Sequence, residues 1–423
     1  MKKALVMAGG GTRGIYQAGA VEALRELGED DWNIITGTSV GALNAVMLVQ
    51  HDFQAMIDMY EHLTADQIIS GFVPNPDDMN LSTLIRERET IIPAFRTWLK
   101  DHGVDIAPFR ELVHEYYHPD RFFASDIDFG CITATAKGHE PVYVTKDMMK
   151  ENGEQWLVAT AAAYPAFPMA VIDGTEYVDG GYFDNFPVDF AMRMGAEEII
   201  AIDLSQNPKH PNYLDRDGIV YIHPHTELFS FLDFDKDRMR TARTMGYNDC
   251  MKAYGRYKGE RYTFYPFEKP AYYNEWYRSV MLLETRIKLA NSISDALRSP
   301  QYITDTLKEQ LFVTHLTSFQ YLFGMMDVLL DMCRADETKI MTYKEARNLL
   351  LASFKEAAEE DFSPFRQMGF NVADRKSVIA RLLHHNLYPE HSFFTENVIL
   401  TVYPFEQALA DLLTYMMKEL AEE

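Results

Sequence analysis

The sequence has few cysteines, few positive charges and no long hydrophobic run. Its three cysteines, Cys131, Cys250 and Cys333, lie far apart, which excludes a disulfide scaffold and a Cys-x-x-Cys metal or redox module. The most apolar long window, residues 156–172, contains two prolines and is too short to cross a bilayer. We therefore expect a protein of the reducing cytoplasm with no integral membrane segment.

Lysine and arginine are outnumbered by acidic residues. The 423 residues include 40 Lys and Arg against 63 Asp and Glu, a formal net charge of −23. Because a negative field of this size repels phosphate backbones and anionic lipid surfaces, we expect no nucleic-acid partner. With 47% hydrophobic residues, the chain can bury a large core, and the composition excludes a disordered or fibrous protein.

The first fifty residues show two strand–loop–helix units. Residues 3–8 and 32–36 are short apolar runs typical of buried strands, and residues 16–27 and 42–50 have helical periodicity. Two such units in succession indicate a parallel sheet with helices on both faces. We predict an α/β fold, a three-layer sandwich with a mainly parallel central sheet.

The later segments divide the chain in two. Residues 51–125 are mostly helical in pattern and predict an insertion or cover over the sheet. Strand patterns then return at residues 128–134, 141–145, 176–178, 198–203 and 220–223, with helices at 188–194 and 236–254. After Pro266, helical periodicity marks every long segment: residues 284–297, 306–332, 343–359, 375–387 and 405–422. We predict an α/β core over residues 1–265 and a helical region over residues 266–423, which covers the site or forms a homodimer.

A serine between glycines is the strongest chemical signal. Residues 37–41 read G-T-S-V-G between a predicted strand and a predicted helix. Flanking glycines allow a sharp turn that lifts the hydroxyl of Ser39 clear of the backbone, as a nucleophile requires. The alternative is a Gly-Ser turn with no chemical role.

A glycine-rich loop, G-G-G-T-R-G at residues 9–14, is the second signal, and three interpretations compete for it. A dinucleotide-binding loop needs an acidic residue at the end of the next strand, but the candidates at residues 29–31 precede that strand. An oxyanion hole needs unobstructed backbone N–H groups near a nucleophile, which suits Ser39. A helix-capping loop is the third interpretation.

A nucleophilic serine needs a base, and Asp179 is one candidate. It ends a strand pattern and is followed by two glycines, so its carboxylate could take the serine proton directly if burial keeps its pKa high enough. The alternative is an Asx-type turn. Histidine is the more usual base, and three residues follow Ser39 in the order that a Ser-Asp-His hydrolase requires: His210, His223 and His225. None of the three lies in a distinctive motif.

A competing metal signal is H-E-Y-Y-H at residues 114–118, which resembles the zinc-binding H-E-x-x-H. Pro119 follows at once, and a third ligand such as Glu140 lacks a helix to support it. We interpret His114 and His118 as residues of a solvated helix end and expect no metal.

Taken together, G-G-G-T-R-G at 9–14, G-T-S-V-G at 37–41 and D-G-G at 179–181 resemble the patatin-like phospholipase family of serine acylhydrolases. The flanking Y-P-A-F-P at 164–168 and N-F-P-V at 185–188 are also similar to the family's pattern.

The resemblance covers about residues 3–255 and leaves out the helical C-terminus. Where members often carry Ala-Ser, this chain has Ala159 and Thr160, a departure that touches no expected catalytic position.

The resemblance implies a role for each motif residue. Ser39 would be the nucleophile and Asp179 its general base, a dyad without histidine. The oxyanion hole would come from the N–H groups of Gly10, Gly11 and Thr12. Arg13 would orient the loop or meet a substrate phosphate, unless it only forms a structural ion pair.

The implied function is hydrolysis of acyl esters of phospholipid or lysophospholipid, through an acyl-enzyme and without a cofactor. Because of the negative charge, we expect monomeric or micellar substrates, with only transient contact to a membrane or micelle. Two other functions stay open: a catalytically silent interaction protein on the same fold, and a nucleotide-binding oxidoreductase that uses residues 9–14.

Overall fold

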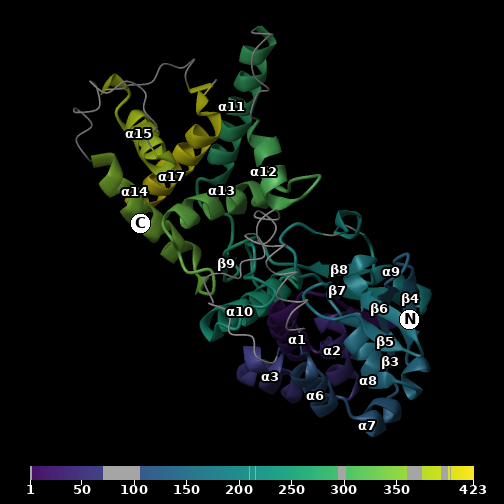
Figure 1. Cartoon of the computed structure of the whole chain (residues 1–423). Helices are drawn as coiled ribbons and strands as arrows, with labels where there is room; N and C mark the ends of the chain where they lie inside the picture. Colours follow the sequence, from purple (N-terminus) through teal and green to yellow (C-terminus); the bar gives the residue numbers. More distant parts are fainter. Residues whose placement is uncertain are drawn as a thin grey trace. The chain divides into compact units, whose positions relative to one another are not determined.

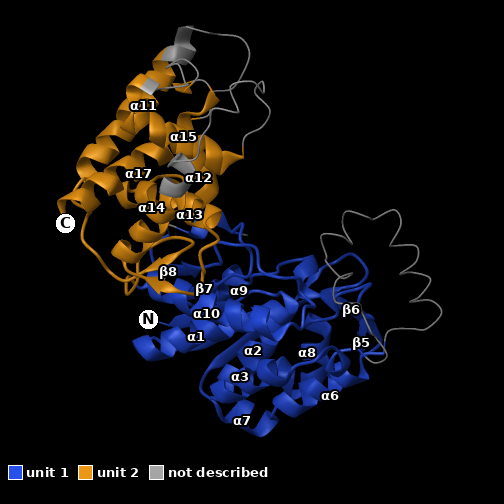
Figure 2. Ribbon diagram, turned by 90° about the vertical axis from the view of Figure 1, so that its left-hand side faces the viewer, with its two compact units in different colours: residues 1–254 blue, residues 255–423 orange. Residues whose placement is uncertain are grey.

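The computed structural model describes residues 2–69, 105–208, 210–214, 216–293, 302–359, 374–391, 399–400 and 402–423. The chain forms two compact units, unit 1 over Met1–Tyr254 and unit 2 over Gly255–Glu423 (Figure 2). None of the described helices is long and apolar enough to span a membrane.

Unit 1 is built on a mainly parallel sheet, which confirms the predicted fold class. Its strands lie in the order β5-β6-β3-β2-β1-β7-β8, and β4 pairs with β3. The parallel strands are β1 (Lys3–Met7), β2 (Ile34–Thr38), β3 (Asp128–Thr135), β7 (Glu198–Ile202) and β8 (Ile219–Ile222). The antiparallel strands are β4 (Pro141–Thr145), β5 (Ala170–Ile172) and β6 (Thr175–Asp179).

Helices cover both faces of this sheet (Figure 1). On one face, the Thr36 hydroxyl donates to the carbonyl of Pro187, the residue before α9 (Val188–Arg193). On the other, the next strand residue, Gly37, lies against the start of α2 (Val40–Val49). Because successive strand residues point to opposite faces, α2 and α9 lie on opposite sides of β2 and complete three layers.

The remaining helices of unit 1 include a close pair, α1 (Ile15–Leu27) and α10 (Lys236–Ala253). A Cβ on Gly19 would lie 1.8 Å from the carbonyl oxygen of Arg243, and one on Gly246 would lie 2.0 Å from that of Tyr16, so only glycine permits this packing. The other described helices of the unit are α3 (Phe53–His62), α6 (Ala107–Tyr116), α7 (Pro119–Ala124) and α8 (Gly153–Thr160).

The predicted insertion at residues 51–125 is helical in α3, α6 and α7, while residues 70–104 lie outside the described part of the chain. The sequence patterns did not predict α8 or β5, both of which involve the apolar window at residues 156–172.

Strand β3 brings two strand ends together. Along one edge it pairs with β4 from Gly130 to Ala134, so β2 and β6 share its other edge. There Thr38 of β2 pairs with Ile132, and Asp179 of β6 pairs with the next residue, Thr133. The turn after β2 and the end of β6 therefore meet, and Ser39 and Asp179 occupy that meeting point.

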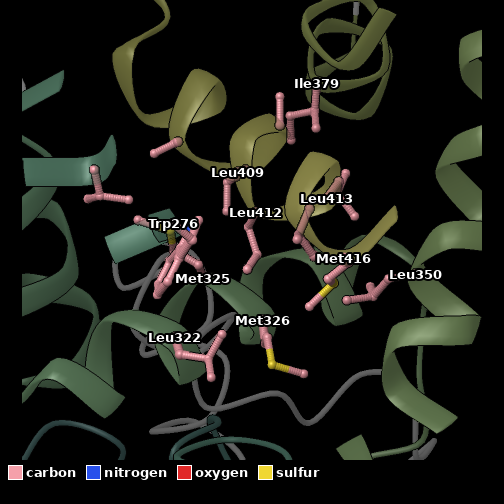
Figure 3. Close-up of a cluster of buried hydrophobic side chains, with 14 of the residues drawn as sticks. Trp276, Leu322, Met325, Met326, Leu350, Ile379, Leu409, Leu412, Leu413 and Met416 are labelled. Atoms are coloured by element: carbon pink, nitrogen blue, oxygen red, sulfur yellow. The ribbon is translucent and has the colours of Figure 1, made fainter. Parts of the chain in front are cut away.

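Unit 2 is helical, as predicted for the C-terminal region. Its described helices are α11 (Tyr273–Ile293), α12 (Ile303–Leu311), α13 (Ser318–Met332), α14 (Tyr343–Glu359), α15 (Arg375–Leu387) and α17 (Pro404–Glu422). A short parallel pair joins β9 (Thr263–Phe264) to β10 (Ile340–Met341). Trp276, Met325 and Leu412 belong to its apolar core (Figure 3).

The segment predicted as one helix at residues 306–332 is two helices. Phe312 ends α12 in the left-handed conformation, with a φ of 55°, and Thr317 caps the start of α13 by accepting the N–H of Gln320. The helical periodicity continues across this break, so it concealed the break in the sequence.

Candidate active site

Ser39 stands at a strained turn between β2 and α2. Its φ of 54° and ψ of −126° lie where residues with a side chain seldom occur. The chain reverses so sharply that a Cβ on Gly37 would lie 2.4 Å from Gly41, and a Cβ on Gly41 would lie 2.3 Å from the carbonyl oxygen of Met7. Both glycines of G-T-S-V-G are therefore required by close backbone contacts.

The carboxylate of Asp179 lies beside the side chain of Ser39, and both line the same cavity. It accepts the backbone N–H of Gly181 at 2.7 Å. Asp179 is only 8% exposed, and burial raises its pKa to about 6, although the hydrogen bond from Gly181 and the neighbouring side chain of Ser39 lower it. A carboxylate with this pKa is ionised at neutral pH and yet basic enough to accept a proton.

The glycine loop at residues 9–14 follows β1 and faces the same space. Among the described residues, no acceptor is bonded to the N–H groups of Gly10 and Gly11. The N–H of Thr12 instead donates to the carbonyl of Phe231 at 2.8 Å, and the Thr12 hydroxyl donates to the same oxygen. The expectation for Thr12 is thereby corrected, because its N–H is not available to an oxyanion in this structure.

Other contacts fix the loop from both sides. Asn185 accepts the N–H of Gly9 on its own carbonyl at 2.9 Å and donates its side-chain amide to the Gly9 carbonyl at 2.9 Å. The Arg13 guanidinium donates to the carbonyl of Gly10 at 3.1 Å. This contact is the one expected if Arg13 orients the glycine loop.

A three-residue segment at the C-terminal end of α8, residues 160–162, contacts the backbone of both Ser39 and Asp179. The hydroxyl of Thr160 accepts the N–H of Ser39 at 3.0 Å, and it donates to the carbonyl of Ile132. The carbonyl of Ala162 accepts the N–H of Asp179 at 2.8 Å.

A cavity of about 460 Å³ opens over these residues. Its polar part includes Ser39, Asp179 and the glycine loop. Its apolar part includes Leu43, Met59, Leu63, Ile68, Phe109, Leu112 and Phe167. An apolar cavity with a few convergent polar groups suits a ligand with a long apolar portion and one reactive polar group.

The described lining contains no histidine. His210 lies 3.8 Å from Asp184, and the rings of His223 and His225 contact each other at a tilt, with centroids 4.7 Å apart. The last two follow β8, three strands away from β2, or roughly 14 Å at the usual strand spacing. The structure therefore does not bring these three histidines to Ser39.

The metal and dinucleotide alternatives gain no support from the geometry. Helix α6 ends at Tyr116, so His114 and His118 do not lie one turn apart on a helix, and no group of metal-ligating side chains occurs within the described ranges. Near the glycine loop, Glu29 and Asp31 form ion pairs with Lys3. Strand β2 ends in the serine turn and carries no acidic residue there.

Three residues of this site were not recognised from the sequence as part of it: Thr160, Asn185 and Phe231. Asn185 lay in a segment noted only for its resemblance, and Thr160 was noted only as a departure from the family pattern. No motif pointed to Phe231, which contributes a backbone carbonyl that any residue could supply.

The mainly parallel α/β sheet thus brings together a serine at a strand–helix turn, a buried carboxylate and a glycine-rich loop. Residues 5–192 match the family model described as "Patatin-like phospholipase", so the chain carries a patatin-like phospholipase domain.

Curated relatives are similar over about half of the chain. "Patatin-like phospholipase domain-containing protein 7" of Rattus norvegicus is 29% identical over 206 residues, 48% of this chain and 13% of that protein. "Lysophospholipase nte1" of Aspergillus terreus is 26% identical over 202 residues, 47% of this chain and 12% of that protein. The chain thus spans about an eighth of the length of these relatives.

Two solved structures also resemble the chain. VipD from Legionella pneumophila is 13% identical with a TM-score of 0.41, over 98% of this chain and 91% of that one. The type III effector protein ExoU is 13% identical with a TM-score of 0.30, over 95% of this chain and 81% of that one.

Proposed function

We propose that this protein is a serine acylhydrolase that cleaves carboxylic ester bonds of lipids, with phospholipid or lysophospholipid as substrate. The placement of Ser39 beside the buried carboxylate of Asp179 carries the proposal, because it pairs a nucleophile with a base whose pKa is about 6. The family match over residues 5–192 and the lysophospholipase relatives support the lipid substrate.

In the first half of the reaction, the Ser39 oxygen attacks the ester carbonyl carbon and its proton passes to Asp179. The N–H groups of Gly10 and Gly11, together with the start of α2, stabilise the oxyanion that forms. The bond to the alcohol then breaks, and the alcohol leaves with the proton held by Asp179. An acyl-Ser39 ester remains.

In the second half, water gives a proton to Asp179 and attacks the acyl carbon. The Ser39 oxygen leaves and takes that proton back, and the carboxylic acid is released. One carboxylate thus acts as base and then as acid in each half, so no histidine is needed.

The apolar wall of the cavity would hold the acyl chain. Leu43 of α2, Met59 of α3 and Phe109 of α6 line it, and burial of each methylene contributes about 0.8 kcal/mol. Several buried methylenes are therefore enough to favour esters of longer acyl chains over acetate esters.

Three exposed aromatic side chains, two of them in the lining of the cavity, form what we call the aromatic rim: Tyr164, Tyr182 and Phe183. They are 46%, 45% and 49% exposed. Tyr164 and Tyr182 line the cavity, and the hydroxyl of Tyr182 donates to the carbonyl of Tyr164. Exposed aromatic residues partition to lipid interfaces, so we propose transient contact of this rim with a micelle or an uncharged lipid surface.

Two further assignments belong to the proposal. The helical unit 2 would form a homodimer, and sedimentation of the full chain tests this. The three cysteines are free, with Cys131 and Cys250 buried, and this supports a location in the reducing cytoplasm.

Release of fatty acid from lysophosphatidylcholine and from phosphatidylcholine micelles tests the function directly. We expect the wild-type chain to release fatty acid and Ser39→Ala to remain at background. If neither lipid nor a short-chain ester is hydrolysed, the protein is a silent interaction protein. Thermal stabilisation by NAD would indicate the oxidoreductase instead.

A further inference from the structure

Thr160 links the nucleophile turn to the central sheet. Its hydroxyl accepts the N–H of Ser39 at 3.0 Å and donates to the carbonyl of Ile132 on β3. Ile132 is the residue that pairs with Thr38, directly before the serine. The Thr160 hydroxyl therefore joins β3 to the peptide of Ser39, and the pairing of Ile132 with Thr38 joins β3 to the residue before it.

The same short segment also contacts the base. Two residues after Thr160, the carbonyl of Ala162 accepts the N–H of Asp179 at 2.8 Å. The backbones of Ser39 and Asp179 are thus both held by one stretch of three residues at the C-terminal end of α8. This arrangement fixes their separation through backbone contacts, independently of any contact between their side chains.

Thr160 does this without touching the substrate space. Its side chain is 0% exposed, and it is not among the residues that line the cavity. The Ser39 N–H lies in the strained turn, where φ is 54° and the pairing of β2 with β3 has ended, and the acceptor that satisfies it is the Thr160 hydroxyl.

We propose that Thr160 is a positioning residue for catalysis: its hydroxyl holds the peptide of Ser39 so that the serine oxygen faces both Asp179 and the N–H groups of the glycine loop. The inference rests on the proposed function for its kinetic consequence, but the hydrogen bond itself can be tested without turnover. A displacement of the nucleophile by a fraction of an ångström is enough to slow the acylation step by about tenfold or more.

The test compares three variants of the full chain. Thr160→Val keeps the shape and removes the hydroxyl, and Thr160→Ser keeps the hydroxyl. Thr36→Val is the matched control, because Thr36 is also fully buried in this sheet and donates its hydroxyl to a backbone carbonyl, that of Pro187, without contacting Ser39.

We expect Thr160→Val to lower kcat on a short-chain ester by about tenfold or more, with KM within twofold and an unchanged pH midpoint. Thr160→Ser should restore kcat, and Thr36→Val should leave it within twofold. Hydrogen–deuterium exchange of the peptide that contains residue 39 should speed up in Thr160→Val alone.

Equal loss of kcat in Thr160→Val and Thr36→Val would overturn the inference, and so would unchanged exchange at residue 39. If exchange responds as expected but wild type hydrolyses no ester, the positioning contact stands and the proposed function fails. The two failures are therefore distinguishable.

Discussion

The carboxylate of Asp179 lies beside the side chain of Ser39, and burial raises the pKa of this carboxyl to about 6. The carboxylate is the base only when ionised, so we expect kcat/KM to fall about tenfold per pH unit below pH 6 and to level off above it. A pH profile from 4.5 to 8 on a soluble ester measures this. A midpoint that disappears in His210→Ala would contradict the assignment, since the base would then be histidine.

The same pKa predicts that Asp179 lowers stability at neutral pH. Its carboxyl titrates near 3.9 in the unfolded chain and near 6 in the folded one, so the folded protein binds more protons between these values. Stability therefore falls as pH rises through this window, by about 3 kcal/mol at pH 7. We expect Asp179→Asn to raise the thermal unfolding midpoint at pH 7 and to give no gain below pH 4.

Ser39→Ala provides the control for that experiment. It removes the serine hydroxyl, which lowers the pKa of Asp179, but leaves the carboxyl in place. The pKa of Asp179 should therefore rise further, and the thermal unfolding midpoint at pH 7 should not increase. Equal unfolding midpoints of wild type and Asp179→Asn at pH 7 would contradict a raised pKa of the Asp179 carboxyl in the folded protein.

The structure predicts that alanine substitution has very different effects at two glycines with similar φ angles. Gly11 has a φ of 60°, and a Cβ there would lie 1.9 Å from the carbonyl oxygen of Phe231. Gly28 has a φ of 73° with nothing within 4 Å of its Cβ position. We expect Gly11→Ala to lower kcat by about a hundredfold or more, because the oxyanion donors move.

Gly28→Ala should cost about 1–2 kcal/mol of stability from left-handed strain and leave kcat unchanged. Steady-state kinetics measures kcat of both variants, and thermal unfolding measures their stability. Near-normal turnover by a folded Gly11→Ala protein would remove the loop from the mechanism.

The proposed role of the aromatic rim predicts that a charge on it slows hydrolysis of micellar substrate but not of soluble substrate. Phe183 is 49% exposed and does not line the cavity, so Phe183→Asp should leave hydrolysis of a soluble short-chain ester within twofold. On phosphatidylcholine micelles it should lose about tenfold, because a charge opposes contact with the lipid interface. Leu282→Asp adds the same charge at a 59% exposed position of α11 and serves as the control. Parallel losses on both kinds of substrate would contradict a role of the rim in lipid contact.

Much of the fold was predictable because its signals are local. The strand–loop–helix units at residues 3–50 follow from apolar periodicity, and α14 and α15 begin and end at the predicted residues. The glycines around Ser39 were informative for the same reason, since the backbone contacts that require them arise within one turn and its neighbouring strand.

The contacts that complete the site were not predictable because they join distant segments. Thr160 is 121 positions from Ser39, Asn185 is 176 from Gly9, and Phe231 is 219 from Thr12. The antiparallel pairing of β6 beside the end of β2 is likewise a property of the assembled sheet. No periodicity or propensity encodes which of many distant hydroxyls or carbonyls reaches a given N–H.

The most direct test of the account is covalent trapping of the nucleophile. Wild type, Asp179→Asn and His210→Ala would each be treated with a fluorophosphonate ester, and the adduct located by peptide mass spectrometry. We predict one adduct, on Ser39, formed about a hundredfold or more slower in Asp179→Asn and at the wild-type rate in His210→Ala. An adduct on another residue, or labelling that needs His210 and not Asp179, would contradict a serine–aspartate dyad.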